Sequence, residues 1–425
     1  MIRILDLTDP AARTLRAFAA ADASVGPTVA AIIADVRARG DLAVRELTAK
    51  FDGAQLEELF LPEAHWNALE AQCSAPVRRA LELANERVRA FHAPQIPPSY
   101  EQALPDGGRV RCLTLPLSRA ACYVPGGRAA YPSTVIMTAS VARLAGVPEV
   151  IVTTPPRRDG SVPVEVAAAA RIAGAHRILR AGGAQAVAAL ALGTQTIPRA
   201  DVIVGPGNAY VTEAKRQLSG EVGIDALAGP TEVVIVADQT ASPALVAHDL
   251  IAQAEHDPLA LAILVTPSRA LADAVQVALA TELLEHPNPI ASESLAARGA
   301  AVVAPDLTAA LAFANELAPE HLELLLAPQA TEAALAQVPK AAAVFVGHYA
   351  PVPVGDYLAG PNHTLPTSGT ARFSSPLSAS DFVRRQNVIE YTPRQLLHDE
   401  PHLLSLAAAE GLHAHGRAAS ARGVK

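Results

Sequence analysis

Two successive series of short apolar segments, separated by alanine-rich stretches, constrain the fold of this chain more than any other feature. The first series is EVIVTT (149–154), HRILRAG (176–182), DVIVGPG (201–207) and TEVVIVAD (231–238), and the second is LAILVT (261–266), AAVVAP (300–305), HLELLL (321–326) and AAAVFVG (341–347). Strands that are apolar throughout are typical of parallel sheets covered by helices on both faces. The pattern therefore predicts an α/β fold with two doubly wound, Rossmann-like domains and a cleft between them.

The other segments surround these two domains. Residues 1–115 carry apolar residues at helical spacing and predict an N-terminal helical region, which could also complete the second α/β domain. We expect the first domain at 116–236 and the second at 237–373. The C-terminal arm, 374–425, holds a polar stretch and one last helix; it is too short for its own core, so we expect it to pack on something else.

Composition excludes several classes of protein. The net charge is −8 and there is no dense run of Lys or Arg, which argues against nucleic-acid binding. Three widely spaced cysteines, Cys73, Cys112 and Cys122, make neither a disulfide framework nor a C-x-x-C zinc site, and fit a reducing compartment. No signal peptide and no apolar stretch of membrane-spanning length are apparent, so we expect a cytoplasmic protein without membrane contact.

Polar residues at three places are candidates for a metal site. In DLIAQAEHD (249–257), Gln253 and His256 would lie on one face of a helix with spacing suitable for two metal ligands, although by themselves they fit an exposed polar helix end better. In VGDYLAGPNHTLPTSG (354–369), glycines and prolines predict a loop that fixes Asp356 and His363. Alternatively, Asp356 simply forms a turn with its own backbone.

The third place is EGLHAH (410–415), which contains Glu410, His413 and His415 and could equally be a solvated chain end. One of these histidines, together with Gln253, His256 and Asp356, would make a mixed nitrogen and oxygen ligand set. Such a set suits Zn²⁺ or a neighbouring first-row ion better than Ca²⁺ or Mg²⁺. Because the set contains no cysteine, the site would be open to a substrate.

The segment LAPEHLEL (317–324) places two ionisable residues, Glu320 and His321, side by side among leucines. Ionisable groups are expensive to bury unless they are paired. The pair is therefore either a loop tip facing water or a pair of acid–base groups with a chemical task.

Three glycine-rich turns, within 123–134, 182–186 and 205–218, are candidates for binding phosphate. A turn between a strand and a helix lets phosphate approach main-chain amides at the positive end of the helix. None of the turns matches the common dinucleotide fingerprint or a P-loop.

Taken together, these stretches resemble the histidinol dehydrogenase family from about residue 115 to the end. The carriers of the resemblance are YVPGG, GGAQA, GPGNAYVTEAKRQ, AGPTE, QAEH, APEHLEL, GDYLAGPNHTLPT and EGLHAH, in the order of the family. The resemblance implies zinc-dependent oxidation of L-histidinol to L-histidine through L-histidinaldehyde, with two NAD⁺. It also implies a homodimer in which the C-terminal arm crosses to complete the site of the partner subunit.

The resemblance assigns roles by motif position. The implied zinc ligands, which would also contact substrate, are Gln253, His256, Asp356 and His415; the acid–base pair is Glu320 and His321; the NAD contacts are Tyr123, Gln185 and Asn208; the further substrate contacts are Thr231, His363 and Glu410, together with His321. His413 falls beside its motif position and takes no role. Thr231 stands where the family has serine, and it keeps the hydroxyl.

Three other functions stay open at this point. A related zinc and NAD dehydrogenase could act on another polar alcohol, such as a sulfonated diol, although EGLHAH and His363 suit a substrate that bears an imidazole. A zinc hydrolase could use Glu320 to activate water, but it would leave the GPGN turn and the paired α/β pattern without a purpose. The third is a metal-binding or scaffold protein without catalysis.

Overall fold

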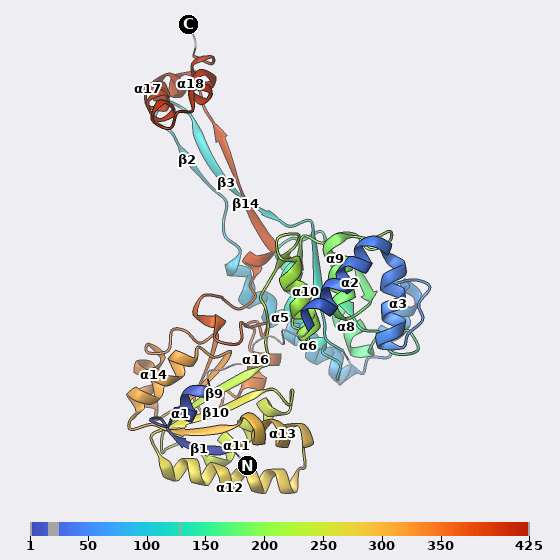
Figure 1. The fold of residues 1–425 in the computed structure, drawn as a ribbon, viewed down its shortest axis with the longest axis vertical. Coiled ribbons are helices and arrows are strands. Elements are labelled where there is room, and N and C mark those ends of the chain that lie inside the picture. Colours follow the sequence, from blue (N-terminus) through green and yellow to red (C-terminus); the bar gives the residue numbers. More distant parts are fainter. Residues whose placement is uncertain (1, 16–24, 127–128, 424–425) are drawn as a thin grey trace.

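Two parallel β-sheets and one projecting antiparallel sheet organise the chain (Figure 1). The structure is a computed structural model, and it describes residues 2–15, 25–126 and 129–423. All eight strands expected from the apolar segments form, and the predicted α/β fold class is confirmed. Among the described residues, no helix combines the length and the apolarity that a membrane crossing requires.

The smaller parallel sheet has the strand order β6-β5-β4-β7-β8. Its strands are β4 (Arg119–Tyr123), β5 (Glu149–Thr154), β6 (Arg177–Arg180), β7 (Val202–Val204) and β8 (Gly223–Ile224). One face is covered by α2 (Gly26–Arg39), α3 (Asp41–Asp52), α9 (Gly183–Leu192) and α10 (Ala209–Leu218). The other is covered by α4 (Glu63–Glu70), α5 (Ala75–His92), α6 (Pro132–Val135), the π-helical turn η3 (Ile136–Ser140), α7 (Val141–Leu144) and α8 (Val164–Ile172). The N-terminal helices α2–α5 therefore pack on the first sheet and not on the second.

The larger parallel sheet has the order β1-β11-β10-β9-β12-β13. Its strands are β1 (Arg3–Asp6), β9 (Glu232–Ala237), β10 (Leu261–Thr266), β11 (Ala300–Val303), β12 (His321–Leu325) and β13 (Ala343–Val346). Its helices are α1 (Pro10–Thr14), α11 (Pro243–Ala254), α12 (Arg269–Glu285), α13 (Pro289–Arg298), α14 (Leu307–Leu317), α15 (Pro328–Leu335) and α16 (Val352–Tyr357). From the described part of the N-terminal region, β1 and α1 alone join this sheet.

The position of β9 corrects the predicted boundary between the domains. TEVVIVAD was expected to be the last strand of the first domain, which was placed at 116–236, but β9 pairs with β10 and β12 inside the larger sheet. The chain thus passes to the second sheet before β9. The apolar run correctly predicted a buried strand, because burial on both faces is the same in either sheet.

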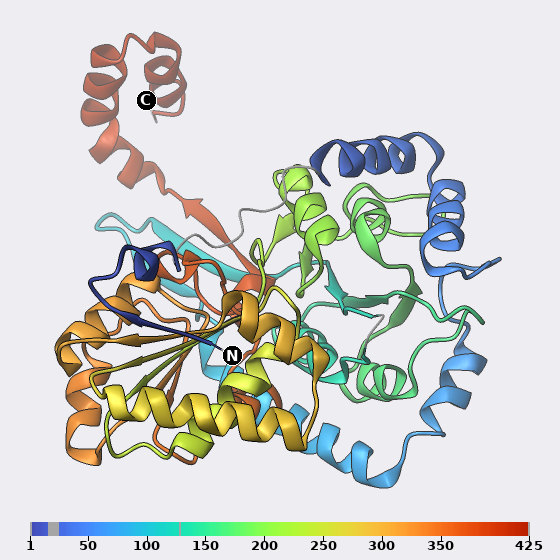
Figure 2. The same cartoon turned by 60° about the horizontal axis from the view of Figure 1, so that its bottom comes forward.

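A three-stranded antiparallel sheet carries the C-terminal helices away from the two parallel sheets, as Figures 1 and 2 both show. It consists of β2 (Tyr100–Ala103), β3 (Arg109–Pro116) and β14 (Val383–Glu390), and it is followed by α17 (Pro393–Ala409) and α18 (His413–Ser420). The predicted arm is therefore longer than 374–425, because residues from the supposed N-terminal helical region form two of its strands. The single last helix is in fact two, which pack on each other and are separated at Gly411, where φ is 70°.

The arm buries few of its apolar side chains against the described part of the same chain. Every residue of β2 is exposed, and so are several large apolar residues of the arm. These are Tyr100, Ile389, Tyr391, Leu397, Leu403, Leu404, Leu406 and Leu412. Apolar surface concentrated on a projecting element is typical of a segment that contacts another chain.

Candidate functional site

The Glu320–His321 pair lies where the chain enters β12, at the amino-terminal edge of the larger sheet. Only 7% of Glu320 and 5% of His321 is exposed, so the interpretation as a loop tip facing water is wrong. Ligands of open parallel sheets usually lie at the carboxyl ends of the strands. This pair lies at the opposite ends, beside the first residues of β9.

Glu320 is held as a hydrogen-bond acceptor by residues that precede or begin β9. Its Oε2 accepts a hydrogen bond of 2.6 Å from the Thr231 hydroxyl and one of 2.9 Å from the main-chain N–H of Glu232. Burial raises the pKa of Glu320 to about 7, although these two donors act to lower it. The carboxyl can therefore take up and release a proton near neutral pH.

His321 is oriented by a main-chain carbonyl. Its Nδ1 lies 3.1 Å from the carbonyl oxygen of Glu232 and 3.6 Å from Oε2 of Glu320. Because a carbonyl oxygen only accepts, the neutral ring carries its proton on Nδ1, and the lone pair on Nε2 is free to accept another. Burial lowers the pKa of His321, against the opposing effect of the Asp356 carboxylate, so the neutral ring is the favoured form.

Gln253 lies in the last turn of α11 and has one unsatisfied buried atom. Its Nε2 donates to the Thr231 hydroxyl over 2.8 Å, and that hydroxyl donates in turn to Glu320. The amide orientation follows, because an oxygen that donates its only proton to Glu320 has to accept from Gln253. The amide Oε1 is then left buried without a hydrogen-bond partner, which is costly unless a cation or another donor satisfies it.

His256 lies differently from the prediction. The helix α11 ends at Ala254, so His256 follows the helix and is exposed, and it does not share a helical face with Gln253. It is nevertheless close enough to interact electrostatically with Glu320, His321 and His363. Gln253 thus reaches Glu320 through Thr231, and His256 lies near the same carboxyl from the turn after the helix.

Asp356 was expected in a loop and lies instead in the last turn of α16. Burial raises its pKa to about 6, and His321 and Glu320 are near enough to influence it in opposite directions. His363 does lie in a loop, is half-buried, and has its pKa lowered to about 4 by burial. Both side chains therefore belong to the environment of the Glu320–His321 pair.

The loop that carries His363 is attached to the helices of the smaller sheet. The Nδ2 of buried Asn362 donates to the carbonyl of Met137 in η3 over 2.7 Å. π-Helical turns often occur at functional sites. This contact places His363 between the two parallel sheets, where the sequence predicts a cleft.

The residues of EGLHAH do not join the others within one chain. Glu410 caps α17, and His413 and His415 lie in the first turn of α18; all three are exposed at the far end of the arm (Figure 1). The structure thus brings together Thr231, Gln253, His256, Glu320, His321, Asp356 and His363, and leaves Glu410 and His415 apart.

The predicted nucleotide contacts share the carboxyl edge of the smaller sheet. Tyr123 ends β4, and its hydroxyl accepts from the main-chain N–H of Gly183, 2.9 Å away, at the start of α9. Gln185 is buried in the first turn of α9, and Asn208 caps α10 by accepting from the N–H groups of residues 210 and 211. In an open parallel sheet this edge is the usual place for a nucleotide.

Sequence reasoning missed a cavity of about 620 Å³ at the carboxyl end of β5. It is lined by Phe51, Asp52, Gly126, Ala129, Ala130, Pro155, Pro156, Arg157, Arg158 and Pro163. The signal that could have found it is Pro155, which directly follows the EVIVTT strand at its carboxyl end. Residues 127 and 128 of the first predicted glycine-rich turn lie outside the described residues.

A buried ion pair clamps the GPGN turn that follows β7. The ammonium of Lys215 donates to the Gly205 carbonyl and to Asp225, each over 2.6 Å, and Asp225 accepts the Gly205 N–H over 2.7 Å. Gly205 has φ of +111°, and an added Cβ would lie 2.1 Å from the Tyr123 carbonyl oxygen. The close approach of the turn to Tyr123 therefore requires glycine.

Lys215→Met is expected to lower the free energy of unfolding by about 3–5 kcal/mol, because it leaves the Asp225 carboxylate buried without its cation. Chemical denaturation of the whole chain measures the loss. The control is Arg37→Met, because the ion pair of Arg37 with Glu221 is exposed and such pairs contribute little. Equal losses of unfolding free energy in the two variants would show that the buried Lys215–Asp225 pair stabilises the fold no more than an exposed pair does.

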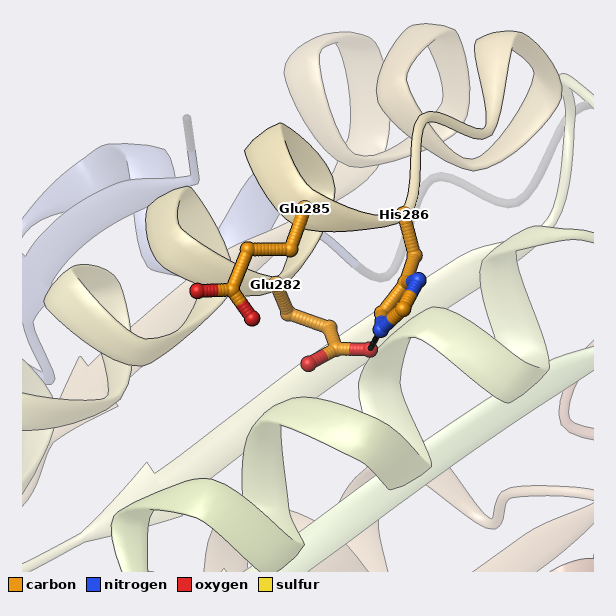
Figure 3. A group of neighbouring side chains, drawn as sticks. All are labelled: Glu282, Glu285 and His286. Carbon is orange, nitrogen blue, oxygen red and sulfur yellow. Dashed lines mark ion pairs between the residues drawn. The ribbon is translucent and has the colours of Figure 1, made fainter.

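A different cluster on the surface has metal-binding residue types. Figure 3 shows Glu282, Glu285 and His286 at the end of α12. In the described ranges, these form the one group of three His, Cys, Asp or Glu whose possible ligand atoms lie within 4.8 Å of one another. Glu282 is already within 3.8 Å of His286 and 3.5 Å of His248, and the group is largely exposed, so ion pairing accounts for it.

Comparisons with known proteins point to one family. The sequence model of the histidinol dehydrogenase family matches residues 16–423. The chain is 47% identical to a histidinol dehydrogenase of Synechococcus over 93% of its length and 91% of the relative, and 46% identical to one from Halalkalibacterium halodurans over 93% of both. A crystal structure of histidinol dehydrogenase from Elizabethkingia anophelis superposes with a TM-score of 0.92 at 32% identity, covering 99% of this chain and 98% of that one.

Proposed function

Because the chain belongs to the histidinol dehydrogenase family of oxidoreductases, we propose that it oxidises L-histidinol to L-histidine in two steps, through L-histidinaldehyde. When bound, NAD⁺ would serve as the hydride acceptor, with one molecule used for each of the two steps. The observation that carries the proposal is the buried Glu320–His321 pair, in which a neutral imidazole with a free Nε2 adjoins a carboxyl that titrates near pH 7.

In the alcohol step, Nε2 of His321 takes the hydroxyl proton as the hydride leaves the same carbon. The lowered pKa of His321 supports this role, because the ring has to be neutral to act as a base. The Nδ1–H keeps its hydrogen bond to the Glu232 carbonyl. This bond holds the ring in the required orientation when Nε2 takes the substrate proton.

In the aldehyde step, Glu320 removes a proton from the water that adds to the carbonyl carbon. The protonated His321 returns its proton to the former carbonyl oxygen, so the hydrated aldehyde carries a hydroxyl whose proton the ring, neutral again, can take. Protons must therefore be removed in both steps from oxygen atoms that are, or become, bound to one carbon, and this gives a reason for two adjacent bases. The pKa of about 7 for Glu320 supports the assignment, because a general base works best when its pKa is close to the operating pH.

Zn²⁺ would be held by Gln253, His256 and Asp356 of one chain and His415 of the partner chain. The partnerless Oε1 of Gln253 and the neighbouring imidazole and carboxylate suit such an ion. When bound, the ion would fix the amine and imidazole of the substrate and so orient the alcohol carbon. Thr231, His363 and Glu410 are the further substrate contacts in this proposal.

The nucleotide would bind along the carboxyl edge of the smaller sheet, at Tyr123, Gln185 and Asn208. The neighbouring cavity supports this placement, because its proline and phenylalanine walls suit a flat adenine ring. A homodimer, with each arm reaching across to the partner, would bring Glu410 and His415 to a site. The exposed leucines of the arm support that association.

The zinc hydrolase and the scaffold without catalysis are both wrong, because members of this family are dehydrogenases. Zinc content measured together with histidinol-dependent NADH formation, on one sample, tests the proposed function. We expect two NADH for each histidinol consumed. No NADH at saturating Zn²⁺ and NAD⁺, or faster oxidation of a sulfonated diol than of histidinol, would contradict the proposal.

Glu320→Gln is expected to slow the oxidation of histidinaldehyde more than that of histidinol, by at least about tenfold. The amide keeps the shape of the carboxylate but takes no proton from water, whereas His321 is left intact for the alcohol step. Stopped-flow measurement of NADH formation from each substrate gives the comparison. Equal damage to both steps would contradict the role of Glu320 in activating water.

A further inference from the structure

Glu232 is a buried carboxyl residue to which the proposed mechanism gives no task. It is the first residue of β9, and 1% of it is exposed. Its main chain holds both members of the catalytic pair, because its N–H donates to Glu320 Oε2 and its carbonyl accepts from His321 Nδ1. One residue therefore contacts both side chains that transfer protons.

The side chain of Glu232 adds two hydrogen bonds from other segments. Its Oε1 accepts from the main-chain N–H of Glu320 over 3.2 Å and from that of Ser368 over 3.0 Å. Glu232 and Glu320 are thus held reciprocally, since the carboxyl of each accepts the main-chain N–H of the other. Such a double contact resists relative movement of the two strand ends.

The contact with Ser368 reaches the loop that carries His363. Ser368 and Gly369 both have positive φ, 56° and 70°, and this conformation is costly for serine. Thr367 is held as well, because its hydroxyl accepts the N–H of Gly229 over 2.6 Å. Buried residues 364–367 connect this turn to His363, so a displacement of the turn would reach the substrate position.

We propose that Glu232 is a positioning residue, whose carboxyl holds Glu320, His321 and the 367–369 turn in the one arrangement that faces the substrate. This inference rests on the proposed function of the pair. In this role the carboxyl of Glu232 acts as a hydrogen-bond acceptor, and its negative charge is not required. Its Oε1 accepts two main-chain N–H groups, and its Oε2 is buried without a hydrogen-bond partner.

The surroundings of Glu232 also favour a neutral group. Burial, followed by the charge of Glu320, raises the pKa of Glu232 to about 8. Two adjacent buried carboxyls do not both ionise without a large cost, so one proton stays with the pair at neutral pH. A side-chain amide should therefore replace the carboxyl of Glu232 with little loss of kcat.

The test compares Glu232→Gln with Glu232→Ala in the full-length, zinc-loaded chain. We expect the glutamine variant to keep kcat within about threefold for both histidinol and histidinaldehyde, since its Oε1 still accepts both N–H groups. The alanine variant should lose about 10- to 100-fold in kcat with both substrates, through misplacement of the bases, and keep its KM for NAD⁺. Rates are expressed per folded molecule, so that a loss of stability alone does not lower them.

Asp238→Ala is the matched control. Asp238 follows the same strand at its opposite end, and its Oδ2 accepts the N–H of Ala327, which follows β12. We expect Asp238→Ala to lower stability and leave kcat unchanged. Wild-type kcat in folded Glu232→Ala would overturn the positioning role, and a glutamine variant as slow as the alanine variant would overturn the acceptor role. A wild-type chain that does not oxidise histidinol would instead refute the proposed function.

Discussion

His321→Ala lowers kcat for histidinol oxidation by about 10²–10⁴-fold, the range expected for loss of a positioned general base. The loss should fall on kcat, with KM for NAD⁺ unchanged, because His321 lies on the larger sheet and the predicted nucleotide contacts lie on the smaller one. Steady-state NADH formation measures both quantities. The control is His248→Ala, since this exposed histidine lies earlier on α11 and contacts a main-chain carbonyl and Glu282.

The pH dependence of the same variant gives a second readout. Burial depresses the pKa of His321, so the neutral ring that acts as base is fully present above the ordinary value of about 6.5 and is lost as the pH falls through the depressed value. The alcohol step of the wild type should therefore decline only on the acid side of pH 6.5. That decline should be absent from the residual activity of His321→Ala. A variant within about threefold of the wild type, with the same acid decline, would contradict the assignment.

The sequence predicts the buried strands of this fold well and the exposed strands poorly. All eight apolar runs form strands, because continuous apolar residues have few other places in an α/β protein. The arm strand β14, with the sequence VRRQNVIE, is mostly exposed, and it therefore lacks the apolar signal. The strand β4 is an exception, because it is buried in the middle of the smaller sheet and was nevertheless missed, since RAACY is short and rich in alanine.

Which sheet a strand joins depends on contacts that no local pattern encodes. The apolar run of β9 is compatible with either sheet, and β1 pairs with β11, almost three hundred residues away in the sequence. Similarly, Gly355 and Gly360 favour a loop around Asp356, yet α16 forms there. Gly355 packs so closely on Phe345 that an added Cβ would lie 2.6 Å from the ring, and this tertiary contact outweighs the local preference.

The sequence predicts which residues belong to the candidate site better than it predicts the hydrogen bonds that join them. Adjacent Glu320 and His321 are visible in the sequence, and so are the polar motifs around them. The chain of hydrogen bonds from Gln253 through Thr231 to Glu320 needs the amino edges of β9 and β12 to meet. The role of Glu232 cannot be seen in the sequence for the same reason. Two of its four hydrogen bonds to Glu320, His321 and Ser368 use its own main-chain atoms, which any residue has.

Two inactive variants, His415→Ala and His321→Ala, should recover about a quarter of wild-type activity when their subunits are mixed in equal amounts. If each arm completes the site of its partner, a mixed dimer has one site with an intact His321 from one chain and an intact His415 from the other. The second site of that dimer carries both substitutions. Half of the randomly formed dimers are mixed and half of their sites are intact, which gives the expected fraction.

Mixing His321→Ala with Asp356→Asn is the control for this experiment. Both residues lie beside Glu320 in the same chain, so every site of a mixed dimer contains one damaged residue and no activity returns. Native mass spectrometry confirms that mixed dimers have formed. Mixed dimers of His415→Ala and His321→Ala that stay inactive would show that the arm serves its own chain or no site at all. Restored activity would require the arm, which in Figure 1 carries His415 away from the other candidate ligands, to reach the partner subunit.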